Sequence, residues 1–110
     1  MAASRVLLRA VARQDIDAAV DFYLQQSAPQ AATDLVDELE RALQHLARFP
    51  STGSPRYAHE LDLPGLRVWA LSQFPYLVFY QDQGESLDVW RVLHQRKDMP
   101  QSFQDQGLAS

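Results

Sequence analysis

The sequence predicts an α+β domain in which an N-terminal strand and a helix hairpin pack on a small antiparallel β-sheet. Three observations predict this fold. After a short alternating segment, helical periodicity occupies most of the first half of the chain. Three apolar segments rich in β-branched and aromatic residues follow in the second half. The links between those segments are short, which permits antiparallel neighbours and excludes parallel crossovers among them.

The first half of the chain is predicted to contribute one strand and two helices. Apolar residues alternate over Val6–Ala10, as in a half-buried strand, and recur at helical spacing after Ala12. A break at Ser27-Ala28-Pro29 starts the second helix, which ends before Pro50. The break is short, so the two helices form an antiparallel hairpin. The second helix carries one continuous apolar stripe, made of Leu35, Leu39, Ala42, Leu43 and Leu46.

The second half is predicted to contain a loop and three strands. Three prolines and two glycines interrupt residues 50–65, which is the composition of a loop. The strands are expected at LRVWAL, YLVFY and LDVWRVLH, and the middle one is apolar on both faces, as in a central strand. Strict alternation would divide the last strand between two faces, with Leu87, Val89, Arg91 and Leu93 on one and Asp88, Trp90, Val92 and His94 on the other.

Composition limits the classes of function. The 110 residues suit one domain, and the polar tail from about residue 104 is a candidate for disorder. Without cysteine, disulfides and cysteine-based zinc sites are excluded, and the three histidines lack paired ligand spacing. We therefore expect no metal and no cofactor. The N-terminus is too short and too interrupted for a signal peptide, and no apolar run approaches the ~20 residues that span a bilayer. We expect a cytoplasmic protein without membrane contact.

Charge is distributed unevenly along the chain. The net charge is −4, and residues 11–49 carry seven acidic residues against three arginines. Residues 82–90 carry three acids and no base, whereas residues 91–97 carry three bases and no acid. A wide basic footprint is absent, so we expect no direct binding of nucleic acid. The compact cation cluster instead focuses attraction at one point of an acidic surface.

Four segments carry a resemblance to a known family: FPSTG at 49–53, EL…PGLRV at 60–68, FPYLVFY at 74–80 and VWRVLHQRKDMP at 89–100. With the order of elements from Val6 to about Phe103, they resemble the ParE toxins of the ParE/RelE superfamily of toxin–antitoxin, or plasmid-stabilisation, systems. The resemblance implies one RelE/ParE-like toxin domain over residues 1–110, held inactive by a cognate antitoxin. It also implies a target, because ParE members poison DNA gyrase whereas RelE members cut messenger RNA in the ribosome.

The composition favours the gyrase interpretation. RNA cleavage requires a base, an acid and cations around the phosphate. In a nuclease, Tyr57, Tyr76 and Tyr80 could be catalytic, and the cation cluster could contact the phosphate. RelE-like enzymes generally have basic surfaces, whereas this chain has one lysine and a net negative charge. We therefore predict a protein that inhibits DNA gyrase by binding and has no catalytic residues. The alternatives are a ribosome-dependent mRNA endonuclease and an antitoxin-binding scaffold without toxicity.

Two sets of residues are predicted to form sites. The toxic surface is expected at the cations of the strand ends together with the tail from Asp98 to Phe103, and its candidates are Arg67, Arg91, His94, Arg96 and Lys97. Structural roles are the alternative: Arg91 would pair with Glu60, Asp62 or Asp98, Arg67 would form a salt bridge across the sheet, and His94 would be a hydrogen-bonded strand end. The antitoxin is expected on apolar residues outside the helical stripes, namely Phe22, Leu24 and Val36.

Overall fold

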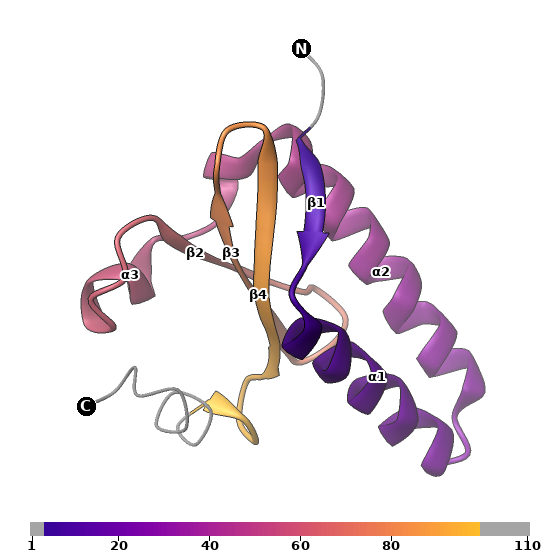
Figure 1. Cartoon of the computed structure of the whole chain (residues 1–110). Coiled ribbons are helices and arrows are strands. Elements are labelled where there is room, and N and C mark those ends of the chain that lie inside the picture. The colour runs from indigo at the N-terminus through magenta and orange to yellow at the C-terminus, as the bar shows by residue number, and fades with distance from the viewer. Residues whose placement is uncertain (1–3, 100–110) are drawn as a thin grey trace.

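The computed structural model describes residues 4–99 as one four-stranded sheet with helices on both faces. In chain order its elements are β1 (Arg5–Leu8), α1 (Ala10–Gln25), α2 (Pro29–Arg48), the 3-10 turn η1 (Pro50–Thr52), α3 (Arg56–Glu60), β2 (Leu66–Ala70), β3 (Tyr76–Asp82) and β4 (Ser86–His94). Figure 1 shows the hairpin of α1 and α2 beside the sheet, with α3 at its other side. The tail from about residue 104, including its predicted disorder, lies outside the described residues.

The sheet has the strand order β1-β4-β3-β2. The pairs β2–β3 and β3–β4 are antiparallel, as the short links predict. The predicted α+β fold is confirmed, and β1 adds to β4 in parallel, so the complete sheet is mixed. The first strand is also shorter than predicted and shifted, because Ala10 already belongs to α1.

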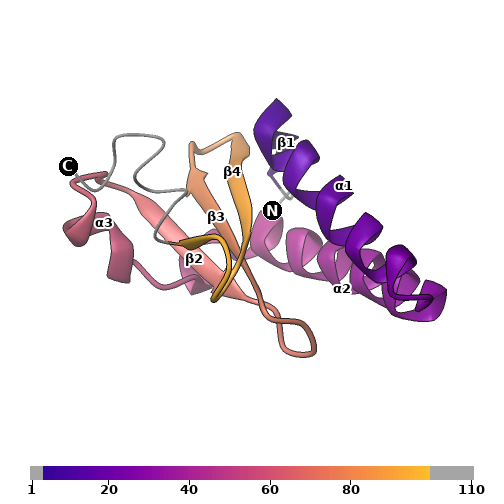
Figure 2. The same cartoon turned by 90° about the horizontal axis from the view of Figure 1, so that it is seen from below.

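Two apolar cores lie on the two faces of the sheet, which stands between α3 and the helix hairpin in Figure 2. The larger core is built against the predicted stripe of α2, of which Leu35, Leu39, Ala42 and Leu46 are buried and Leu43 is half-buried. The smaller core lies against α3 and contains Leu61, Leu66, Val68, Phe79, Leu93 and Met99. Burial on both faces of β3 agrees with its predicted central position.

A β-bulge corrects the predicted faces of β4. Phe79 pairs with Arg91 and Tyr80 pairs with Val89, so Trp90 is an extra residue without a partner of its own on β3. The alternation therefore changes phase at Trp90. Val92 joins the larger core with Leu87 and Val89, whereas Leu93 joins the smaller core, against which Trp90 also packs.

The predicted loop of residues 50–65 is wrong in part, because it contains η1 and α3. Pro50 is the first residue of η1, and Pro55 immediately precedes α3. Proline has a fixed φ that suits the first turn of a helix, so the residues that interrupt the sequence pattern here initiate short helices. Tyr57 and Ala58 of α3 pack against the smaller core.

Candidate functional site

The turn that follows β4, over residues 94–98, is organised by His94. The Nδ1 atom of His94 accepts hydrogen bonds from the backbone N–H of Arg96 at 3.1 Å and of Lys97 at 3.2 Å. The carboxylate of Asp98 accepts the backbone N–H of His94 at 2.8 Å. These bonds turn the chain back on itself and leave the side chains of Arg96 and Lys97 exposed. The prediction of a hydrogen-bonded histidine is confirmed.

His94 is neutral in this arrangement. Burial lowers the pKa of His94 below its usual 6.5, and the charge of Lys97 lowers it further, while Asp98 raises it and Arg96 again lowers it. A nitrogen that accepts two N–H bonds carries no proton, so we assign the ring proton to Nε2. The turn therefore depends on an unprotonated Nδ1.

Arg91 pairs with Asp15 of α1. Its Nε and Nη2 atoms donate to the two carboxylate oxygens of Asp15 at 2.8 and 2.9 Å. The partners predicted for Arg91, which were Glu60, Asp62 or Asp98, are wrong. Asp15 also accepts the backbone N–H of Val92 at 3.0 Å. Because β1 accompanies β4 only as far as Val89, the Asp15 carboxylate serves as the hydrogen-bond partner of β4 beyond the end of β1.

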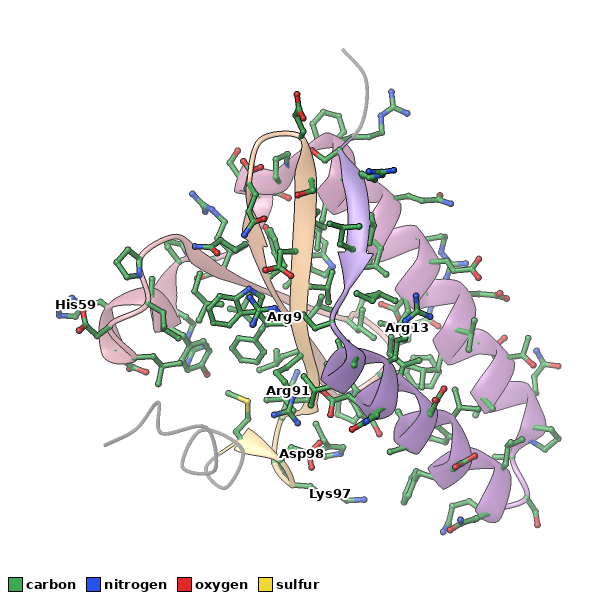
Figure 3. The ribbon with its side chains drawn as sticks, viewed as in Figure 1. Arg9, Arg13, His59, Arg91, Lys97 and Asp98 are labelled. Carbon is green, nitrogen blue, oxygen red and sulfur yellow. The ribbon has the colours of Figure 1, made fainter. Side chains whose placement is uncertain are left out.

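A cavity of about 250 Å³ opens between α1 and the end of β4; we call it the α1–β4 cavity. The ammonium group of Lys97 lies 4.0 Å from the ring centroid of Phe22, which places a cation from the turn against α1. Figure 3 shows Arg91, Lys97 and Asp98 gathered at the end of β4 beside α1, whereas His59 lies far away with α3. The lining includes Asp15, Phe22, Tyr76, Arg91, His94 and Lys97.

Tyr76 of β3 lines the α1–β4 cavity next to His94. The two rings meet edge to face, with centroids 5.3 Å apart. Burial raises the pKa of the Tyr76 hydroxyl to about 12, and Tyr23 and Asp98 add smaller contributions in the same direction. Tyr76 is therefore protonated at neutral pH, so its hydroxyl can donate a hydrogen bond but cannot act as a base.

Arg67 lies apart from the other predicted cations. It belongs to β2, at the opposite edge of the sheet from β1, and its Nη1 donates to the carbonyl oxygens of Ser51 at 3.2 Å and of Gly53 at 2.6 Å. The predicted salt bridge across the sheet is therefore wrong. The nearby Tyr80 hydroxyl donates to the Pro50 carbonyl and accepts the Gly53 N–H. The structure brings together Arg91, His94, Arg96 and Lys97, and leaves Arg67 to hold η1.

The predicted antitoxin residues divide between two places. Leu24 and Val36 line one groove of about 360 Å³ between α1 and α2, which we call the hairpin groove. Phe22 instead lines the α1–β4 cavity. Leu24 is 50% exposed and Phe22 is 38% exposed, whereas Val36 is half-buried. An open apolar groove on the hairpin is therefore present where the sequence predicts a partner.

Residues 4–99 contain no helix that is both long and apolar enough to cross a membrane. Within the same residues, no group of three or more histidine or acidic side chains could hold a metal ion.

Comparison with known proteins identifies the family. The model of the family described as the ParE toxin of the type II toxin–antitoxin system parDE matches residues 6–99. The chain belongs to this family. It is 27% identical over 97 residues to Y4kP of Sinorhizobium fredii, a proposed toxin, and the match covers 88% of this chain and 92% of that protein. The fold is similar to that of a solved chain of the chromosomal ParDE system from P. aeruginosa, with a TM-score of 0.69 and 21% identity over 83% of this chain and 95% of that chain.

This ParE-type toxin contains residues at the site that sequence patterns do not reveal. Asp15 lies beyond the first turn of α1, and its carboxylate reaches the backbone of β4. Tyr76 fits the pattern of a buried strand residue. Glu38 of α2 lies outside the site but is also unexpected, because it is buried and its carboxylate accepts hydrogen bonds from Ser72 and Gln73. Each of these roles depends on a partner far away in the sequence, so no local spacing indicates it.

Proposed function

We propose that this toxin inhibits DNA gyrase by binding, through the turn at residues 94–98, and that a cognate antitoxin neutralises it in the bacterial cytoplasm. One observation carries the proposal: a ParE family member with a net charge of −4 presents Arg96 and Lys97 together on a single braced turn. A focused positive spot on an acidic protein accelerates association with an acidic partner surface.

The packing beneath the turn supports its role as a binding surface. Arg91 and Asp15 fix β4 to α1, so the turn projects from a rigid base. His94 and Asp98 restrict the backbone of the turn before any partner arrives. Less conformational entropy is then lost on binding. The predicted contribution of the tail to Phe103 concerns residues outside those described and stays a prediction.

The residues of the site support inhibition rather than RNA cleavage. A general base accepts a proton and must therefore be deprotonated near neutral pH, whereas the Tyr76 hydroxyl, with a pKa of about 12, keeps its proton there. Tyr80 is completely buried, and its hydroxyl is already bonded to Pro50 and Gly53. Tyr57 belongs to α3 and packs on the ring of Phe79 in the smaller core, and it does not line the α1–β4 cavity.

The hairpin groove supports the antitoxin assignment. A type II antitoxin segment that folds on its toxin needs an open apolar groove for a helix or a sheet edge for a strand. Leu24 and Val36 supply the apolar walls of such a groove, and Asp37 lines it as well. We propose that the antitoxin lies along this groove and continues toward Phe22 at the α1–β4 cavity.

Two assays on the purified chain separate the proposed target from the alternatives. In the first, DNA gyrase supercoils relaxed plasmid in the presence of the toxin, and we expect inhibition that the cognate antitoxin relieves. In the second, translating ribosomes and mRNA are supplied, and we expect no cleavage. Ribosome-dependent cleavage without gyrase inhibition would establish the nuclease alternative, and neither effect would establish the scaffold alternative.

A third assay tests the antitoxin groove. The double variant Leu24→Ser with Val36→Ser should bind the antitoxin at least about tenfold more weakly, because it removes two apolar contacts of roughly 1 kcal/mol each. Val11→Ser is the matched control, since Val11 is an exposed apolar residue of the same helix that does not line the groove. Equal affinities of the double variant and the control would contradict this placement.

A further inference from the structure

We propose that the α1–β4 cavity binds a single carboxylate side chain, which an aspartate or glutamate of the antitoxin inserts beside Tyr76, His94 and Lys97. The assignment to the antitoxin rests on the proposed function, whereas carboxylate binding rests on the cavity alone. With a volume of about 250 Å³, the cavity is smaller than the sites that hold drug-sized ligands or cofactors, and it suits one side chain.

The first argument is an unused donor at the floor of the cavity. Tyr76 is only 6% exposed, and its hydroxyl makes no hydrogen bond within residues 4–99. None of the described residues has a fully buried side-chain N or O atom without a partner. The Tyr76 hydroxyl is therefore not sealed in the core but reaches the cavity that it lines. A buried ring with an open hydroxyl is prepared to donate to a ligand.

Two further donors belong to residues that line the same cavity. The Nδ1 atom of His94 is occupied by the turn, so Nε2–H is the ring donor that remains. Lys97 makes no ion pair among the described residues, and its ammonium lies over the ring of Phe22 at the cavity wall. One ammonium and two neutral donors form a set that accepts one anionic group, because hydrogen bonds to a charged acceptor are the stronger ones.

The acidic residues of the cavity are already engaged. Asp15 is neutralised by two bonds from Arg91 and also accepts the Val92 N–H. Asp98 accepts the His94 N–H. The side chains of Ala18, Ala19 and Phe22 form an apolar wall, which suits the methylene groups of a glutamate better than a free inorganic anion.

Propionate is the probe for this proposal, because it reproduces the end of a glutamate side chain. The full chain is titrated with sodium propionate at constant ionic strength, and the ring signals of His94 and Tyr76 are followed by NMR. We expect saturable shifts and a rise in the pKa of His94, since an anion beside the ring favours its protonated form. Propionamide, which is neutral, should bind roughly tenfold more weakly or not at all.

Variants place the ligand within the cavity. Tyr76→Phe and Lys97→Met should each weaken propionate binding by roughly tenfold, because each removes one donor to a charged acceptor. Arg96→Met is the matched control: it removes a neighbouring cation that does not line the cavity, and it should change the affinity by less than about twofold. Melting curves confirm that each variant is folded.

Several results would overturn the proposal. Tighter binding of propylammonium than of propionate would make this a cation site. An equal loss in Arg96→Met and Lys97→Met would mean general charge attraction without a site. Tyr76→Phe should also weaken the complex with the cognate antitoxin, and an unchanged affinity there would remove the antitoxin as the source of the carboxylate. The titration uses neither gyrase nor antitoxin, so its failure is distinguishable from failure of the proposed function.

Discussion

Tyr76 and Tyr80 lie four residues apart on β3, belong to the same core and have opposite surroundings. The Tyr80 hydroxyl donates to the Pro50 carbonyl at 2.5 Å and accepts the Gly53 N–H at 3.0 Å. The Tyr76 hydroxyl makes no hydrogen bond within the described residues and lines a cavity. One end of the strand is therefore closed by its own chain, whereas the other end presents unused donors.

The two ends of β3 differ in what their polar groups bind. At the closed end, Arg67 and Tyr80 hold η1 against the sheet, so the FPSTG segment is fixed from two sides. At the open end, the Asp15 carboxylate accepts the Val92 N–H of β4 in place of a neighbouring strand. Within residues 4–99, the Tyr80 hydroxyl is bonded on both sides, whereas the Tyr76 hydroxyl keeps its donor capacity.

The largest expected effect is at the base of the open end. Asp15→Ala removes the carboxylate that pairs with Arg91 and that accepts the Val92 N–H. The free energy of unfolding should therefore fall by about 3 kcal/mol. The comparison variant is Arg9→Met, which breaks the more exposed Arg9–Asp88 pair and should cost about 0.5 kcal/mol. Urea unfolding measures both, and equal costs would show that Asp15 does not brace β4.

The next effect concerns the closed end. A Cβ on Gly53 would overlap the Tyr80 hydroxyl and lie 2.8 Å from its Cε1 atom, so Gly53→Ala should destabilise the fold by about 2 kcal/mol. Tyr80→Phe should cost about 2 kcal/mol, because the Gly53 N–H and the Pro50 carbonyl lose their partner. The double variant should lose less stability than the sum of the two single losses, because the oxygen that clashes with the new Cβ is gone. Additive costs would contradict the close packing described.

A smaller effect follows from His94. Its pKa is lowered in the folded protein, so the unfolded chain binds more protons and stability falls as the pH drops from about 6.5 through the folded pKa. Stability is fully present above the unfolded pKa. His94→Gln removes the histidine part of this pH dependence. Between pH 7.5 and pH 5.5, the variant should therefore lose less stability than the wild type. Equal pH dependence would mean that His94 does not titrate differently on folding.

The smallest effect completes the comparison of the two tyrosines. Tyr76→Phe removes a hydroxyl that has no bond to the described residues, so the stability should change by less than about 0.5 kcal/mol. Chemical denaturation beside Tyr80→Phe is the test. A cost for Tyr76→Phe as large as that for Tyr80→Phe would show that the Tyr76 hydroxyl is part of the core.

The sequence predicted the order of elements well because periodicity is local. The stripe of α2, the hairpin break near Pro29 and the central position of β3 all follow from spacing within one element. The bulge at Trp90 could not be predicted, because one extra residue changes no local pattern but reverses the faces that follow.

The site was predicted only as a cluster of charges. Arg96 and Lys97 stand together because they are adjacent in the chain, and Arg91 and His94 lie nearby for the same reason. The partner of Arg91 is Asp15, which lies 76 positions away, and acids closer in sequence offered equally reasonable choices. The open hydroxyl of Tyr76 likewise depends on how α1 crosses the end of β4. Contacts of that kind are set by the tertiary structure rather than by spacing.

Gyrase inhibition by charge variants tests the central claim most directly. Supercoiling is titrated with the wild type, with Arg96→Ala and Lys97→Ala combined, and with Arg41→Ala and Arg48→Ala combined as the matched loss of two exposed cations on α2. The free energies of unfolding of all three proteins should agree within about 0.5 kcal/mol. The turn variant should inhibit about tenfold more weakly, with a smaller difference at high salt, and the α2 variant should match the wild type. Full inhibition by the turn variant would contradict the assignment of the toxic surface to this turn.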